Sequence, residues 1–368
     1  MACIIQAFIL YKKRYQRSDV TAPYLIVDAH EDIAFNAIVL GRDPRRAVQE
    51  TRAQEPPKGV DGIATSGLPN LLAGNVRIVF ATLYVSPHTN PNPANKTYQT
   101  PEEAQALAQE QLAYYALLAA DPRIALITSR ADLKRIVESP EPRVGLVILM
   151  EGADPIVKPQ DVGKWHEGGV RLIGPAWSQT RYSGGTGKPG PLTPLGKELM
   201  REMTRAKFIL DTSHMAEESF MQALDLFEGT VVASHSNVRK FVPTDRQLSD
   251  DMIRALVKRD GVIGAVFYNQ FLRHQWRQNG AAKNAVTFAT VIEHMKYICD
   301  LAGSTRHCGI GTDFDGGFGM EATPKEIDTV SDLQKYGDAL ADAGFTDADI
   351  RGILGGNWLR VLERALPA

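Results

Sequence analysis

The chain has 368 residues, of which 44% are hydrophobic and 23% are charged, and its formal net charge is −2. This composition is typical of a globular protein, and the near-neutral charge argues against nucleic acid or an anionic membrane as the main partner. The opening run MACIIQAFIL is too short to span a bilayer and has no charged stretch before it, so it predicts neither a membrane span nor a cleaved leader. We treat residues 1–23 as an N-terminal extension. Three cysteines without a CxxC motif suit a reducing compartment, so we expect a cytoplasmic protein.

Apolar runs of strand length recur along the chain, and helical periodicity separates most of them. The predicted strands cover residues 24–32, 77–85, 144–152, 170–177, 207–214, 230–236, 261–268 and 307–315. The third run, VGLVILMEG, is continuously apolar, as parallel strands buried on both faces are. Helices are predicted over residues 101–120, 215–229, 287–301 and 347–366. Eight strands alternating with helices, without a break in composition, predict a single (β/α)8 TIM barrel over residues 24–368.

The stretch from Ala206 to Arg239 contains the fifth and sixth predicted strands with a helix between them. Such a crossover makes the two strands parallel neighbours. His214 and His235 stand at matching ends of these strands, so we expect them side by side at one edge of the sheet. Either histidine alone is an ordinary residue, whereas the pair indicates a metal site.

Further ligand-type side chains fall at the carboxyl ends of other predicted strands, and these ends converge at one mouth of a parallel barrel. The full set is His30, Asp32, Glu151, His214, His235 and Asp313. Imidazoles mixed with carboxylates suit a divalent ion, zinc first, and six such groups exceed the needs of one tetrahedral ion. We therefore predict a binuclear centre with Glu151 as the bridging carboxylate. Taken singly, Asp313 could also be a helix cap and Glu151 an ion-pair partner.

The remaining histidines do not share this placement. His307 lies six residues before Asp313 on the same predicted strand, roughly 20 Å lower and at the barrel floor. We assign it no metal role, and we expect surface or packing roles for His88, His166, His274 and His294. The loop SGGTGKPGPLTP contains GTGK but lacks the first glycine and the final Ser or Thr of a P-loop, so we interpret it as a lid or turn.

Six motifs together resemble the membrane (renal) dipeptidase family of zinc peptidases, within the amidohydrolase superfamily. They are DAHED (28–32), MEG (150–152), DTSH (211–214), ASHSNVR (233–239), FYN (267–269) and GTDFDG (311–316), and the resemblance runs from about Tyr24 to Arg364. It implies that one zinc ion binds His30 and Asp32, that the other binds His214 and His235, and that Glu151 bridges them. It further implies that Asp313 is the acid/base residue, that Arg246 holds the substrate carboxylate, that Tyr268 contacts the substrate, and that the protein is a homodimer.

The chain departs from the family pattern at two positions. Glu31 stands where the family has the Asn of His-Asn-Asp, and strand alternation turns its side chain away from the mouth. Trp177 stands where the family has a histidine that polarises the substrate carbonyl. An indole cannot carry a proton, so we expect Trp177 to contact the substrate as an apolar wall that favours a bulky group beside the scissile bond. Zinc and Arg181 would then bear the oxyanion.

The sequence therefore predicts a binuclear zinc hydrolase that cleaves the amide bond of dipeptides, or of similar small amides with a carboxylate, by metal-bound hydroxide. Asp313 would take up the proton and pass it to the leaving amine. One alternative is another reaction on the same metal centre, such as hydrolysis of a lactone or an N-acyl amide. The other is a catalytically inactive metal-binding or scaffold protein, against which the complete and costly set of buried ligands argues.

Overall fold

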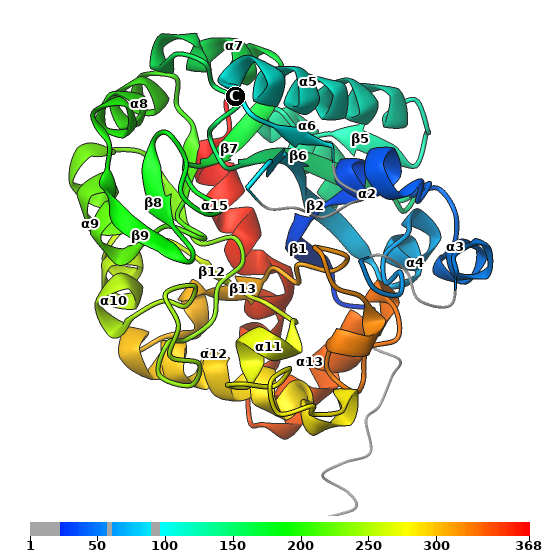
Figure 1. Cartoon of the computed structure of the whole chain (residues 1–368). Coiled ribbons are helices and arrows are strands. Elements are labelled where there is room, and N and C mark those ends of the chain that lie inside the picture. The colour runs from blue at the N-terminus through cyan, green and yellow to red at the C-terminus, as the bar shows by residue number, and fades with distance from the viewer. Residues whose placement is uncertain (1–22, 57–60, 90–95) are drawn as a thin grey trace, which may run out of the picture.

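The computed structural model describes residues 23–56, 61–89 and 96–368, and Figure 1 follows the chain from blue to red. Almost all of the predicted N-terminal extension, residues 1–22, lies outside these ranges. In the described residues, no helix is both long enough and apolar enough to cross a bilayer.

Eight parallel strands make up a nearly closed barrel, which confirms the predicted fold. They are β1 (Ile26–Glu31), β2 (Val76–Tyr84), β6 (Val144–Glu151), β7 (Val170–Gly174), β10 (Ile209–Asp211), β11 (Val231–Val232), β12 (Ile263–Ala265) and β13 (Cys308–Ile310). Within the described chain, neighbouring strands follow the order β11-β10-β7-β6-β2-β1-β13-β12. A parallel bridge between Ala233 and Ile263 joins the two end strands of this order.

Short strands outside the ring of eight pair at three places, one with a barrel strand and two as separate small sheets. β5 (Ile124–Leu126), which the sequence did not predict, pairs in parallel with the start of β6. β3 (Ser86–Pro87) pairs with β4 (Thr97–Tyr98). The glycine-rich loop with the GTGK sequence folds as a hairpin of β8 (Ser183–Gly185) and β9 (Lys188–Leu192), so its interpretation as a turn is correct.

Helices form an outer ring around the strands (Figure 1). Their bounds are α2 (Ile33–Leu40), α3 (Val48–Gln54), α4 (Leu68–Ala73), α5 (Pro101–Leu118), α6 (Arg130–Val137), α7 (Val162–Glu167), α8 (Pro194–Arg205), α9 (Glu217–Leu226), α10 (Asp250–Lys258), α11 (Asn269–Leu272), α12 (Phe288–Ala302), α13 (Leu333–Asp342), α14 (Asp347–Arg351) and α15 (Asn357–Ala365). The predicted closing helix is thus α14 and α15, joined by a π-helical turn at Gly352–Gly356.

The barrel interior is apolar toward the starts of the strands. Val27, Phe80 and Leu172 belong to one buried cluster with Trp358 of α15, and Figure 1 shows α15 behind the ring of strands. The Trp358 indole N–H donates to the Ile310 carbonyl at 2.9 Å, so even the one polar atom of this large side chain is satisfied. The polar residues predicted for the site lie at the other ends of the strands.

The sequence prediction extends the strands beyond the residues at which they end in the structure. The fifth ends at Asp211 instead of residue 214, and the eighth ends at Ile310 instead of residue 315. His214 and Asp313 have φ angles of 65° and 63°, in the left-handed region that non-glycine residues rarely adopt. Such a residue cannot continue a strand, so these two side chains are presented from loops.

Candidate active site

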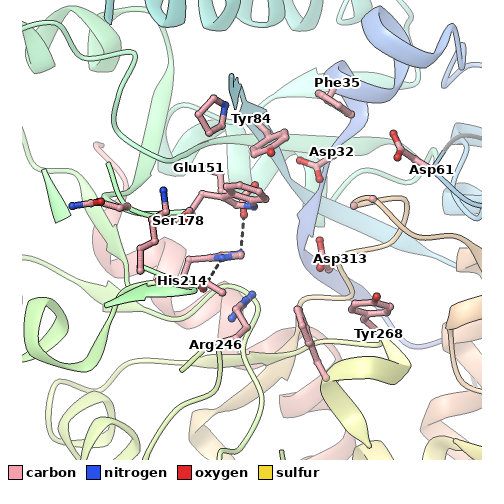
Figure 2. Close-up of a pocket in the computed structure, with 18 of the residues that line it drawn as sticks. Asp32, Phe35, Asp61, Tyr84, Glu151, Ser178, His214, Arg246, Tyr268 and Asp313 are labelled. Atoms are coloured by element: carbon pink, nitrogen blue, oxygen red, sulfur yellow. Dashed lines mark hydrogen bonds and ion pairs between the residues drawn. The ribbon is translucent and has the colours of Figure 1, made fainter. Parts of the chain in front are cut away.

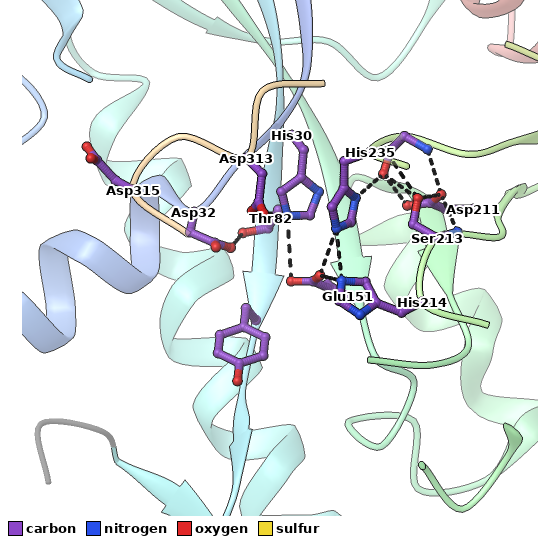
Figure 3. Close-up of polar contacts among 12 residues, drawn as sticks. His30, Asp32, Thr82, Glu151, Asp211, Ser213, His214, His235, Asp313 and Asp315 are labelled. Atoms are coloured by element: carbon purple, nitrogen blue, oxygen red, sulfur yellow. Dashed lines mark hydrogen bonds and ion pairs between the residues drawn. The ribbon is translucent and has the colours of Figure 1, made fainter. Parts of the chain in front are cut away.

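The six ligand-type residues meet at the carboxyl-end mouth of the barrel (Figure 3). His30 lies near the end of β1, and Glu151 is the last residue of β6. Asp32, His214, His235 and Asp313 occupy the segments that follow β1, β10, β11 and β13. All six are buried except His214, which is partly exposed.

Glu151 stands between the histidines. Its Oε1 atom lies 3.2 Å from Nε2 of His214 and 3.4 Å from Nε2 of His235, while its Oε2 atom lies 3.6 Å from Nε2 of His30. The two Nε2 atoms of His214 and His235 are 3.0 Å apart, which confirms that these histidines lie side by side. Each carboxylate oxygen therefore faces a different part of the cluster.

Three overlapping groups have ligand atoms close enough to share one ion, within 4.8 Å of one another. They are His30, Asp32 and Glu151; Glu151, His214 and His235; and His30, His235 and Asp313. Glu151, His30 and His235 each belong to two of the groups, and of these three side chains only Glu151 carries two oxygens that face different groups. The residues that the sequence prediction grouped therefore lie together in the structure, and their roles as ligands are taken up below as a proposal.

The surroundings of His30 favour a cation. Burial lowers the pKa of His30, but the charges of Glu151, Asp32 and Asp313 more than offset it and raise the pKa to about 10. Neither ring nitrogen of His30 has a hydrogen-bond partner in the described parts of the chain. A buried imidazole without partners among several carboxylates fits a divalent cation, because the cation would satisfy both the nitrogen and the negative charge.

Residues outside the predicted set form hydrogen bonds with the candidate ligands. The Thr82 hydroxyl of β2 donates to Oδ1 of Asp32, and the Thr186 hydroxyl lies 3.1 Å from Nδ1 of His214. Nothing in the sequence singled out either threonine. Asp211, the buried last residue of β10, accepts from the backbone N–H groups of Ser213 and Ser234. It stands in the DTSH motif, so position alone could have drawn attention to it.

A cavity of about 520 Å³ opens over the cluster. Figure 2 shows Phe35 and Tyr84 on the opposite side of the histidine and carboxylate groups from Arg246. Phe35 contacts Tyr84 with ring centroids 5.3 Å apart, and Tyr84 contacts Trp177 at the same distance. These three rings, the aromatic wall, line one side of the cavity together.

The other side of the cavity holds Arg246 and Tyr268. Arg246 is 4% exposed, and its guanidinium donates to the His235 carbonyl at 2.8 Å and to the Ser236 hydroxyl at 3.2 Å. Its Nε atom is buried without a hydrogen-bond partner among the described residues. Tyr268 stacks on Phe318 at 4.2 Å, and burial raises its pKa to about 12, so its hydroxyl remains a donor at neutral pH.

Trp177 lies where the sequence predicted, over the mouth. It follows β7 by three residues and lines the cavity with its ring centroid 6.2 Å from that of His214. The expectation for Arg181 is wrong. Its guanidinium donates to the Val157 carbonyl and lies over the Tyr182 ring, and Arg181 is not among the described residues that line the cavity.

Three other residues lie as the sequence predicted. Glu31 turns away from the mouth as expected, and its Oε2 accepts from the Ser66 hydroxyl at 2.7 Å. His307 precedes β13 and lies 2.8 Å through Nδ1 from the Gly261 carbonyl, at the far end of the strand from Asp313. His294 is buried with both ring nitrogens in hydrogen bonds, which confirms a packing role.

A family model and the solved structures of similar proteins indicate the same family for this chain. A family model described as membrane dipeptidase (peptidase family M19) matches residues 14–366. An uncharacterized protein in the pqqA 5′ region of Klebsiella pneumoniae is 32% identical over 251 residues, covering 66% of this chain and 89% of that protein.

Two solved structures resemble the fold along nearly the whole chain. Dipeptidase AC, a metallo peptidase of family M19, is 26% identical with a TM-score of 0.77, covering 94% of this chain and 100% of that one. A metallo peptidase from Rhodobacter sphaeroides, liganded with a phosphinate mimic of the dipeptide L-Ala-D-Ala, is 25% identical with the same TM-score and the same coverage. The chain therefore belongs to the membrane dipeptidase family, peptidase family M19, and is a metal-dependent hydrolase of that family.

Proposed function

We propose that this chain holds two divalent metal ions, zinc first, and hydrolyses the amide bond of dipeptides or of similar small amides that carry a carboxylate. The observation that carries the proposal is the shared carboxylate. A carboxylate oxygen of Glu151 lies within 4.8 Å of ligand atoms of His30 and Asp32 in one group, and of His214 and His235 in another. A carboxylate common to two ligand groups is what a bridged pair of ions requires.

The donor set fits zinc, which binds imidazole nitrogen and carboxylate oxygen and tolerates irregular geometry. When bound, such a pair of ions supplies a Lewis acid for the scissile carbonyl and lowers the pKa of a water molecule. His30 and Asp32 would hold one ion, and His214 and His235 the other.

Asp313 is the residue that we assign to proton transfer. Its Oδ1 atom lies 3.8 Å from Nε2 of His30, and its side chain lines the cavity. Burial raises the pKa of Asp313 well above its ordinary value, with the charges of Asp32 and Glu151 adding to the effect. A carboxyl group with a raised pKa can take a proton from water and return it to the leaving amine near neutral pH.

Arg246 is assigned to the carboxylate of the substrate. A guanidinium in a cavity wall offers parallel N–H groups that match the two oxygens of a carboxylate. The buried Nε without a partner among the described residues supports this role, because a substrate oxygen would satisfy it. Tyr268, on the same side of the cavity, would contact the same half of the substrate.

The substrate class follows from the two ends of the cavity. With the carboxylate at Arg246 and the scissile carbonyl at the metal ligands, the amino-terminal residue of a dipeptide points toward the aromatic wall. The dipeptide mimic bound by the Rhodobacter sphaeroides relative supports dipeptides as the class. The homodimer and the cytoplasmic location remain predictions.

The test is a screen of purified, zinc-supplemented protein against dipeptides of both stereochemistries, with N-acyl amides and lactones alongside. Hydrolysis of dipeptides that is lost with a chelator and restored by zinc supports the proposal. Hydrolysis of lactones or N-acyl amides alone would replace it with another reaction on the same centre. Bound metal without turnover of any of these classes would favour an inactive protein.

A further inference from the structure

The Ser234 hydroxyl lies between a buried carboxylate and a histidine of the proposed metal centre. Its Oγ atom is 2.8 Å from Nδ1 of His235 and also donates to Oδ2 of Asp211. Asp211 is 2% exposed, and Ser234 is fully buried. Ser234 thus links Asp211 to His235, and Figure 3 labels these two ends of the chain of hydrogen bonds.

Ser234 Oγ has a third and longer contact, 3.3 Å to the hydroxyl of Ser213, which donates its own proton to Oδ1 of Asp211. A hydroxyl has one proton, so Ser234 can donate to only one of its neighbours. Oδ2 of Asp211 is a carboxylate oxygen and can only accept, so the Ser234 proton points to Asp211. Ser234 Oγ must then accept from His235, which places the imidazole proton on Nδ1. The lone pair of His235 is left on Nε2, the atom that lies 3.4 Å from Glu151.

The same argument applies to His214, whose Nδ1 partner is the hydroxyl of Thr186. The Thr186 hydroxyl lies 3.1 Å from Nδ1 of His214 and 3.4 Å from the His214 carbonyl, which can only accept. The Nδ1 proton of His214 is thereby favoured as well. Two Nε2 atoms without protons would then face each other at 3.0 Å. Their lone pairs repel each other, and a cation bound to both would remove this repulsion.

We propose that Asp211 and Ser234 are positioning residues that fix His235 in the tautomer with its proton on Nδ1, so that Nε2 is ready to bind a metal ion before the ion arrives. A ligating histidine usually donates its other N–H to a fixed acceptor, and loss of that acceptor weakens metal binding. Here the acceptor is the Ser234 hydroxyl, which donates its own proton to the Asp211 carboxylate.

The other contacts of Asp211 allow a substitution that changes the bond to the Ser234 hydroxyl and keeps the rest. Oδ1 accepts from the Ser213 N–H, the Ser213 hydroxyl and the Ser234 N–H, whereas Oδ2 accepts only from the Ser234 hydroxyl. In Asp211→Asn, the amide oxygen can keep the three contacts of Oδ1, and the amide nitrogen takes the place of Oδ2. That nitrogen donates to Ser234, whose proton turns to His235 and moves the histidine proton to Nε2.

The first measurement is the ring ¹⁵N spectrum of His235 in the metal-free protein, which distinguishes the two tautomers and does not depend on any activity. We expect the Nδ1–H form in the wild type, the Nε2–H form in Asp211→Asn and a mixture in Ser234→Ala. Ser213→Ala is the matched control, because Ser213 also bonds Asp211 but contacts only the backbone N–H of His235. It should keep the Nδ1–H form.

The second measurement is zinc affinity by chelator competition, and this arm alone rests on the proposed metal centre. Ser234→Ala and Asp211→Asn should each weaken zinc binding by about 10- to 100-fold, and Ser213→Ala by much less. A wild type with the proton on Nε2, or a tautomer unchanged by Asp211→Asn in a folded protein, overturns the inference. If Asp211→Asn does not fold, Ser234→Ala decides, and an unchanged tautomer there has the same consequence.

Discussion

Glu151 and His214 are the closest carboxylate–histidine pair of the cluster, with Oε1 of Glu151 3.2 Å from Nε2 of His214. The other oxygen of the same carboxylate faces His30 at 3.6 Å. One side chain therefore lies between two groups of candidate ligands that come from opposite parts of the barrel.

Removal of the Glu151 charge should reduce the metal content of the protein. We expect the zinc-supplemented wild type to approach two ions per chain and Glu151→Gln to lose at least one of them, because an amide is a poor bridge between two cations. Elemental analysis of the purified proteins measures this. Glu31→Gln is the matched control, since Glu31 faces Ser66 instead of the cluster, and it should keep the wild-type content. A firm content of one ion, unchanged in Glu151→Gln, would contradict the bridged pair.

Asp313→Asn should lower kcat by about 100-fold or more, the usual scale for loss of a general acid–base group, and should keep both metal ions. An amide has nearly the shape of the carboxyl group but cannot carry the proton. Metal content and steady-state kinetics on the same preparation separate the outcomes. Loss of an ion would make Asp313 a ligand, in line with its place near His30 and His235; near-normal kcat would remove it from proton transfer.

Arg246→Met should weaken kcat/KM for substrates with a free carboxylate by roughly 2–4 kcal/mol, by analogy with loss of one partner of a buried charge pair. The corresponding amidated dipeptides should lose little, since they offer no carboxylate to the guanidinium. Kinetics on each dipeptide and its amide give the comparison. Equal losses on both would show that Arg246 acts by supporting the His235 carbonyl, to which it donates at 2.8 Å.

Substitutions in the aromatic wall should change substrate preference more than maximal rate. Trp177→Ala removes the largest surface beside the scissile bond, so we expect kcat/KM to fall for dipeptides with a bulky or aromatic amino-terminal residue and to change little for small ones. Trp177→His should restore or raise activity on small dipeptides, because an imidazolium can stabilise an oxyanion that an indole cannot. An unchanged profile in both variants would mean that Trp177 does not touch the substrate.

His294 should make stability fall in mild acid. Burial lowers the pKa of His294 from 6.5 to about 4, although the hydrogen bond to the Leu272 carbonyl acts in the opposite direction. The ring is neutral in the folded protein, with Nδ1 accepting from the Val238 N–H and Nε2 donating to the Leu272 carbonyl. The unfolded chain therefore binds this proton more readily than the folded one. Neutral His294 therefore contributes on the order of 3 kcal/mol to the free energy of unfolding. This contribution is complete above about pH 6.5 and is lost as the pH falls toward 4.

Urea unfolding of the wild type and His294→Asn at about pH 7.5 and about pH 4.5 measures the effect of this proton. The variant should be less stable than the wild type at the higher pH and should lose less stability on acidification. His274→Asn serves as control, because His274 is exposed and should follow the wild type. Equal acid losses in His294→Asn and the wild type would contradict the assignment.

The sequence alone was enough to predict the barrel and the set of residues that meet at its mouth. Hydrophobic periodicity is a local property, so the alternation of strands and helices could be predicted from short windows of residues. A parallel barrel then brings all strand ends of one kind to one mouth, which is why His30 and Asp313 could be predicted as neighbours from opposite ends of the chain.

Only the tertiary structure decided how those residues meet. The strands end early because His214 and Asp313 take left-handed backbone angles, a feature that periodicity does not reveal. Arg181 turns to the Val157 carbonyl, and Ser234 joins Asp211 to His235, because side-chain direction depends on partners from distant segments. Position along the chain fixes which strand end a residue occupies, whereas the packing of separate loops fixes the atom that it presents.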